Sequence, residues 1–156
     1  MRETTGEQVG TNVSDTALRG FVGYNMKRAF NAVQADLTRT LAPHGLRMIT
    51  YSVLALVVEN PRLRPSALAK ALTVERANLV VYVDQLEQAG WVTRTPSSTD
   101  RRAYALQATL EGQQVYARAM AAVRDHDQRM LGALDPSDVA VVNKALATIE
   151  AQGRSL

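Results

Sequence analysis

The chain of 156 residues contains no cysteine. Disulfide bonds, cysteine-ligated zinc and thiol-based redox sensing are therefore excluded, so any sensing function has to use a bound ligand. The longest apolar runs, 53–58 and 79–83, are far too short to span a bilayer, and no apolar segment follows Met1-Arg2 as in a secretory signal. These absences predict a cytoplasmic protein without a membrane partner.

Residues suited to catalysis are also scarce. The chain has only two histidines, His44 and His126. The run Asp125-His126-Asp127 would point in three directions on a helix, so we expect it to be a solvated face. No glycine-rich phosphate loop, His-x-x-x-His pair or nucleophile elbow is present. We therefore expect no enzyme: no catalytic residues, no metal site and no cofactor.

The composition is that of a globular protein, with 46% hydrophobic and 21% charged residues. The length suits one domain with its own core. The formal net charge is +3, a mildly basic balance that fits a nucleic-acid-binding protein but is shared by many unrelated ones.

Apolar residues recur at helical spacing over most of the chain. They predict helices over 15–41, 47–59, 65–72 and 77–89, a further helix capped by Thr109, and a last one from Pro136. The inner face of the second helix is expected to hold Met48, Tyr51, Leu54, Ala55 and Val58. Residues 91–94 and 103–107 alternate with period two, which predicts a β-hairpin around a loop at 95–102. The predicted fold class is mainly α with a small β-hairpin.

This order of elements is typical of a winged helix-turn-helix, which we place at 47–109 within a single domain, 15–156. Helices at 15–46 and 110–156 flank it, and the polar segment 1–14 is expected to be a flexible tail. The flanking helices carry more apolar surface than a small winged domain would cover, which favours a dimer contact. The alternative is that they cover the core of their own chain.

A helix-turn-helix delivers its second helix into the DNA major groove. With Leu79, Val83 and Leu86 inward, the outward arc of this helix carries side chains that suit bases, phosphates or a thymine methyl group. These reading candidates are Arg76, Asn78, Val81 and Gln85. The helical register makes burial of Val80 more favourable than burial of Val81. Side chains around the shorter helix are expected to hold phosphates: Arg62, Arg64, Ser66 and Lys70.

Asp100, Arg101 and Arg102 stand at the predicted tip of the hairpin. Guanidinium groups there can enter a narrow minor groove or hold phosphates, while Asp100 orients one of them. By itself such a loop would be an ordinary solvated turn. Its position directly after a recognition helix predicts a DNA-binding wing.

Several of these segments resemble the MarR family of bacterial regulators. Residues 68–74 and 86–94 are similar to the family's helix-turn-helix and the strand after it, Asp100 and Arg102 match its wing signature, and 109–112 match the cap that follows. The resemblance covers about 15–152. It implies a homodimer, a palindromic operator and a small, often aromatic and anionic, ligand bound between the dimerisation and DNA-binding regions.

The polar and basic stretch 23–29 is similar to a branch of the family that responds to aromatic acids or their coenzyme A thioesters. A pocket that includes this stretch would offer aromatic walls and cations to a carboxylate or phosphate. Its candidate residues are Tyr24, Asn25, Lys27, Arg28, His44, Arg47, Tyr51 and Tyr116. The alternative for each is ordinary: solvated or salt-bridged cations, and tyrosines in the core.

The sequence therefore predicts a ligand-responsive transcriptional repressor. Its expected partners are a double-stranded DNA operator, a second copy of the chain, and a small anionic aromatic ligand or coenzyme A thioester. The alternative is a constitutive winged-helix module, architectural or protein-binding, that takes no ligand. Such a module would bind random duplexes almost equally.

Overall fold

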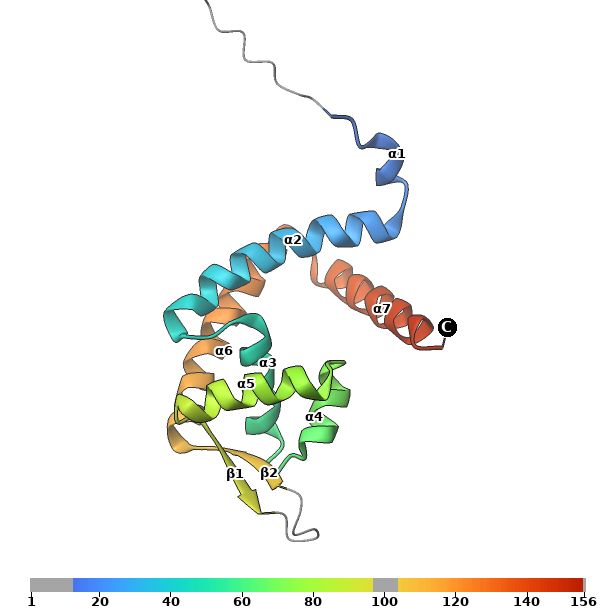
Figure 1. Ribbon diagram of the computed structural model, residues 1–156. Helices are drawn as coiled ribbons and strands as arrows, with labels where there is room; N and C mark the ends of the chain where they lie inside the picture. Colours follow the sequence, from blue (N-terminus) through green and yellow to red (C-terminus); the bar gives the residue numbers. More distant parts are fainter. Residues whose placement is uncertain (1–12, 97–103, 156) are drawn as a thin grey trace, which may run out of the picture. The chain divides into compact units, whose positions relative to one another are not determined.

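Helices predominate in the structure, a computed structural model that describes residues 13–96 and 104–155 (Figure 1). One antiparallel hairpin interrupts them. The predicted fold class, mainly α with a small β-hairpin, is confirmed. The chain divides into two compact units, Met1–Ala32 and Val33–Leu156.

The helices lie close to their predicted positions. They are α1 (Thr16–Arg19), α2 (Val22–Leu41), the 3-10 helix η1 (Ala42–His44), α3 (Met48–Glu59), α4 (Pro65–Leu72), α5 (Arg76–Gln88), α6 (Leu110–Leu131) and α7 (Pro136–Gly153). The strands are β1 (Val92–Pro96) and β2 (Tyr104–Ala108), paired with Val92 opposite Ala108. Between α4 and α5, Thr73 adopts a left-handed conformation with φ of 52°, which ends α4 and makes the turn.

The first predicted helix is interrupted, which corrects the continuous helix expected over 15–41. α1 ends before Gly20, and α2 begins at Val22. At the break, Nδ2 of Asn25 donates to the carbonyl oxygen of Arg19 at 2.9 Å. An uninterrupted helix would pair that carbonyl with a backbone amide four residues on, so the side chain stabilises the break.

The core of the second unit lies where α3 packs against α5, α6 and β2. Leu79, Val83 and Leu86 of α5 are buried, as predicted. On α3 the buried residues are Thr50, Val53, Leu54 and Val57. This corrects the predicted inner face, of which only Leu54 is buried. α3 is apolar on nearly all sides, so its periodicity alone does not determine its rotation.

The hairpin is joined to the helices at both ends. The amide of Leu106 in β2 donates to the carbonyl oxygen of Leu63, just before α4, at 2.8 Å. Thr109 caps α6, as predicted, by accepting a hydrogen bond from the amide of Gly112 at 3.0 Å. A Cβ atom on Gly112 would lie 2.0 Å from the carbonyl oxygen of Trp91. Only glycine therefore lets α6 begin so close to the hairpin.

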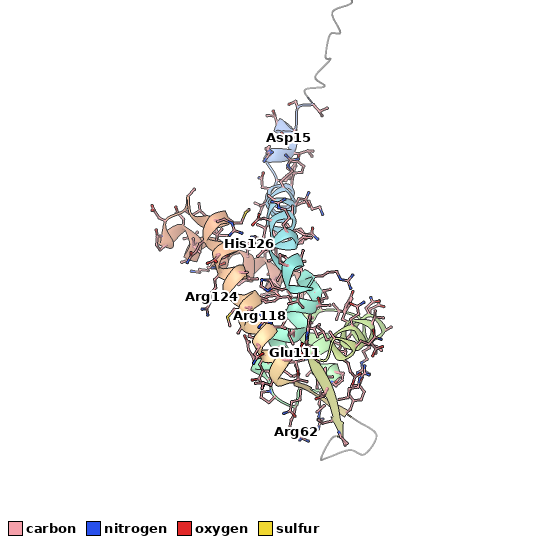
Figure 2. The ribbon with its side chains drawn as sticks, turned by 90° about the vertical axis from the view of Figure 1, so that its left-hand side faces the viewer. Asp15, Arg62, Glu111, Arg118, Arg124 and His126 are labelled. Atoms are coloured by element: carbon pink, nitrogen blue, oxygen red, sulfur yellow. The ribbon has the colours of Figure 1, made fainter. Side chains whose placement is uncertain are left out.

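The second half of α2 is held on α6 by the carboxylate of Asp36. This group accepts hydrogen bonds from Nδ1 of His126 at 2.7 Å, from Arg39 at 3.0 Å and from Arg129 at 3.2 Å. His126, labelled on α6 in Figure 2, is only 4% exposed. The solvated face expected at 125–127 is therefore wrong for the histidine, which lies two helical turns after Ala119 on the buried side of α6.

No residue of α7 is buried. Its apolar side chains Val142, Leu146 and Ile149 are 44%, 42% and 43% exposed, and their spacing puts them on one face. The unit 1–32 also exposes apolar side chains, namely Leu18, Phe21, Val22, Met26 and Phe30. α7 therefore does not cover the core of its own chain.

Among residues 13–96 and 104–155, no three histidine, aspartate or glutamate side chains gather in a way that could hold a metal ion. No single helix among them is long and apolar enough to cross a membrane, and one pair, 22–44 with 48–59, reaches that length and composition only together, across a bend of 65°.

Replacement of Asp36 by Asn should lower stability in a pH-dependent way. The hydrogen bond from His126, with those from Arg39 and Arg129, lowers the pKa of Asp36 to about 2. The ionised carboxylate thus stabilises the fold above about pH 4, the unfolded value, and this contribution is lost as the pH falls toward the folded value. Urea unfolding of wild type and Asp36→Asn from about pH 6 to about pH 3 should show a difference in free energy that narrows toward the acidic end. A difference independent of pH would contradict this assignment.

Candidate nucleic-acid interface

The beginning of α4, the turn after it and the beginning of α5 line one open depression. Its polar lining includes Arg64, Ser66, Lys70 and Arg76. Because Pro65 is the first residue of α4, Ser66 on this lining lies in the first turn of the helix. Four of the residues predicted to contact DNA are therefore brought together around the turn of the helix-turn-helix.

Arg62 lies apart from this group, beside the loop end of strand β1. Its backbone has a φ of 64°, and its guanidinium donates to the carbonyl oxygen of Pro96 at 3.4 Å. Figure 2 labels Arg62 at the hairpin end of the second unit. The remaining wing candidates, Asp100, Arg101 and Arg102, lie outside the described residues.

The outward side of α5 carries Asn78, Val81 and Gln85, all of them exposed. The side-chain oxygen of Gln85 accepts a hydrogen bond from Arg47 at 2.7 Å. This contact joins a residue predicted to read bases with one predicted to bind a ligand. Val80 and Val81 are 45% and 51% exposed, so the alternative in which both valines are buried in the core is wrong.

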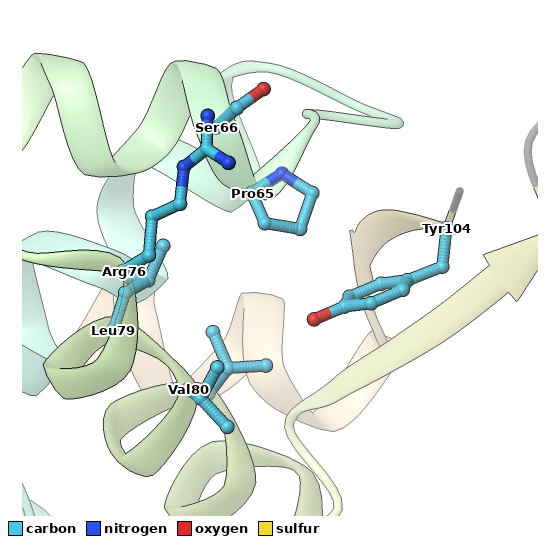
Figure 3. Close-up of a pocket in the computed structure, with 7 residues that line it drawn as sticks. Pro65, Ser66, Arg76, Leu79, Val80 and Tyr104 are labelled. Atoms are coloured by element: carbon cyan, nitrogen blue, oxygen red, sulfur yellow. The ribbon is translucent and has the colours of Figure 1, made fainter. Parts of the chain in front are cut away.

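A cavity of about 180 Å³ lies between α4, α5 and β2. Its lining is mostly apolar and consists of Pro65, Ser66, Arg76, Leu79, Val80, Val83 and Tyr104. Figure 3 shows the ring of Tyr104, on β2, across the cavity from Val80 and Pro65. Val80 therefore faces the hairpin side of α5 rather than the core.

A contact between α5 and the hairpin was not predicted from the sequence. Arg94 of β1 forms ion pairs with both Asp84 and Glu87 of α5. Its guanidinium carbon lies 5.2 Å from the centroid of the Tyr104 ring, close enough for a cation–π interaction. The hydrogen bond to Asp84 raises the pKa of Arg94. Two carboxylates three residues apart on one helical face, followed by an arginine in the next strand, could have predicted this contact.

These ion pairs have two consequences for the interface. They tie β1 of the hairpin to α5. They also neutralise both carboxylates of α5, Asp84 and Glu87, which would otherwise repel DNA phosphates.

Half of the predicted ligand residues lie in the unit 1–32. Tyr24 donates a hydrogen bond to Asp15 at 2.7 Å, which raises the pKa of Tyr24, and Asn25 is engaged at the helix break. The ammonium of Lys27 lies 5.9 Å from the centroid of the Phe30 ring. Arg28 is exposed. Of these four residues, Lys27 and Arg28 are therefore the two that differ from Tyr24 and Asn25. Their side chains are not engaged in the hydrogen bond to Asp15 or in the one at the helix break.

The other half lies in the unit 33–156. Tyr51 and Tyr116 pack with their ring centroids 6.0 Å apart. The hydroxyl of Tyr116 donates to Glu59 at 2.8 Å, and burial together with this bond raises the pKa of Tyr116 to about 12. His44 ends η1 and is half-buried.

Tyr51 also lines a hollow of about 340 Å³ between α3 and α6. The α6 side of this hollow consists of Met120, Val123, Arg124, Asp127 and Gln128. Arg124, labelled in Figure 2, was not among the predicted ligand residues. The hollow thus combines an aromatic wall with an arginine, which is the combination expected for an aromatic anion.

Two helices joined by a tight turn and followed by an antiparallel hairpin define a winged helix-turn-helix protein. The sequence profile of the MarR family matches residues 46–104. A protein of Thauera aromatica named as a regulatory protein for the hcr operon is 34% identical over 132 residues, which are 82% of this chain and 80% of that protein. The chain belongs to the MarR family of DNA-binding transcriptional regulators.

Solved structures of CouR are similar to this chain over most of its length. The transcriptional repressor CouR bound to a 23-mer DNA duplex matches with a TM-score of 0.85 and 33% identity, over 90% of this chain and 99% of that one. CouR from Rhodococcus jostii RHA1 bound to p-coumaroyl-CoA matches with a TM-score of 0.79 and 30% identity, over 86% of this chain and 94% of that one. These similarities confirm the predicted family and support the branch that responds to aromatic compounds.

Replacement of Arg94 by Ala should destabilise the protein by about 1–2 kcal/mol, because it removes two ion pairs and a ring contact at once. DNA affinity should fall as well, since the freed carboxylates repel phosphates. Arg94→Lys, which can pair with only one carboxylate at a time, should be intermediate in both thermal unfolding and fluorescence anisotropy with labelled duplex.

The matched control is Arg154→Ala, which removes an exposed ion pair with Glu150 on α7. It should change stability by less than about 0.5 kcal/mol. Equal effects of Arg94→Ala and Arg154→Ala on stability would mean that the Arg94 ion pairs stabilise the protein no more than an exposed ion pair does.

Proposed function

We propose that this regulator is a homodimeric repressor, and that a small aromatic acid or its coenzyme A thioester releases it from a palindromic operator. The observation that carries the proposal is the similarity to CouR both on DNA and with p-coumaroyl-CoA. The basic depression around the turn between α4 and α5 supports the DNA-binding part. The proposal divides into DNA reading, dimerisation and ligand response.

In DNA reading, the exposed beginning of α5 enters the major groove. Arg76 contacts guanine or a phosphate, and Asn78 makes a paired contact with adenine. Gln85 reaches a base only if its hydrogen bond with Arg47 breaks. Phosphates are held by Arg64, Ser66 and Lys70 around the depression, by Arg62 beside the loop end of β1, and by Arg101 and Arg102 of the wing, while Asp100 orients one of these arginines.

The dimer part is supported by the apolar face of α7. Val142, Leu146 and Ile149 are partly exposed to water along one side of this helix. A second copy offers the same stripe, as a two-fold symmetric interface requires. Two symmetry-related α5 helices would then enter successive major grooves, which explains a palindromic operator.

In the ligand response, cations recognise the anionic group and aromatic rings recognise the ring. Lys27 and Arg28 are exposed cations suited to a carboxylate or to the phosphates of coenzyme A. Tyr51, packed on Tyr116, forms the wall of a hollow whose α6 side carries Arg124. A planar aromatic group stacks well on such a wall.

Asn78→Ala should relax sequence preference, because the lost contact is with a base. Affinity for a duplex selected from a random-sequence library should fall by about 1–3 kcal/mol, with little change for unselected duplexes. Arg102→Ala should weaken binding to all duplexes and reduce the salt dependence by about one phosphate contact. Anisotropy titrations at several salt concentrations measure both. If both variants merely unfolded at lower temperature with unchanged affinity, the segment would be structural.

Lys27→Ala and Arg28→Ala should blunt release while sparing DNA binding. The probe is p-coumaroyl-CoA, added to wild type bound to the selected duplex. Each variant should need about ten-fold more probe for half release, the loss expected for one charge-assisted hydrogen bond. Free p-coumarate and free coenzyme A, added separately, identify which part of the thioester is recognised.

The matched control for this experiment is Lys144→Ala, because Lys144 is an exposed cation on α7 outside the Val142, Leu146 and Ile149 stripe. It should leave the release curve unchanged. An unchanged response in both Lys27→Ala and Arg28→Ala would remove these residues from the site. Wild type that ignores the thioester and binds random duplexes equally would instead be the constitutive module.

A further inference from the structure

We propose that α5 selects its operator by thymine methyl groups, with Val80 and Val81 in contact with the C5-methyl groups of thymines in each half-site. The inference rests on the proposed entry of α5 into the major groove. It names the chemical group, the thymine methyl, that the middle of this helix recognises on the base pairs.

The first observation is the exposure of two adjacent aliphatic side chains. Val80 and Val81 are 45% and 51% exposed. The same helix buries Leu79, Val83 and Leu86 in the core. Neighbouring residues on a helix point about 100° apart, so the two valines together cover a broad apolar arc. An arc of this kind on a DNA-facing helix is complementary to an apolar group in the groove.

The second observation is the absence of available charge in the middle of α5. No charged residue lies between Arg76 and Asp84 in the sequence. Asp84 and Glu87, which could accept from the amino group of cytosine, are both paired with Arg94. Arg76 is therefore the one cation on this helix that suits guanine, and it lies at the helix start. The centre of the helix is suited to the methyl group of thymine, the apolar group that the major groove displays.

The third observation is the apolar surface behind Val80. This side chain lines the cavity of about 180 Å³ together with Leu79, Val83 and Tyr104. Figure 3 shows the Tyr104 ring across the opening from Val80. A methyl group that contacts Val80 is therefore covered by further apolar atoms and removed from water, which makes the contact favourable.

The test removes only the methyl groups. A duplex is selected with the full-length wild type from a random-sequence library and is resynthesised with deoxyuridine at each thymine in turn. Base pairing and phosphates are unchanged by this substitution. At one or two positions in each half-site, we expect wild-type affinity to fall about four-fold for each methyl removed, the effect of burying one such group.

Val80→Ala and Val81→Ala should each become insensitive to deoxyuridine at the thymine that the missing side chain contacted. Val81→Thr, which keeps the shape but replaces one methyl with a hydroxyl, should lose most of the same sensitivity. Val13→Ala removes a valine that is 85% exposed ahead of α1, and it should retain the full wild-type response. Circular dichroism of each variant checks that the fold is intact.

Equal wild-type affinity for the thymine and deoxyuridine duplexes would overturn the inference, as would an unchanged deoxyuridine penalty in both alanine variants. Either result would leave the proposed repressor function standing. A selection in which the wild type enriches no sequence would instead overturn sequence-specific repression, and the inference with it.

Discussion

Burial of Leu79, Val83 and Leu86 is the constraint on which the DNA-binding face depends. These side chains are 2%, 1% and 1% exposed, and their spacing of four and three residues puts them on one side of α5. Rolling the helix about its axis would expose them at about 2 kcal/mol for each side chain. Asn78 and Val81 are held outward because their neighbours are held inward.

A second constraint sets the hairpin relative to that helix. Arg94 bridges Asp84 and Glu87, while the Leu63–Leu106 bridge ties the other strand to the segment before α4. Two carboxylates that share one partly buried guanidinium give these contacts more weight than a single exposed ion pair has. In this MarR-family regulator α5 and the hairpin are thus fixed to each other by ion pairs and to the core by apolar packing.

α6 connects the parts of the second unit. It begins at the hairpin, where Gly112 lies against Trp91, and its second half holds α2 through the hydrogen bond between His126 and Asp36. Along the way it supplies one side of the hollow lined by Tyr51. The proposed ligand surface and the cap that follows the wing therefore belong to one continuous helix.

Apart from the break between α1 and α2, the amino-acid sequence alone determined the order and kind of elements, the winged-helix class, the inward side of α5 and the cap at Thr109. Each of these depends on residues a few positions apart. Only the tertiary structure decided the rotation of α3, since its apolar residues lie on all sides and its neighbours choose among them. The burial of His126 and the partners of Arg94 also required the structure. Their contacts join residues of different elements, Asp36 with His126 and Arg94 with Asp84, and local spacing does not specify which elements meet.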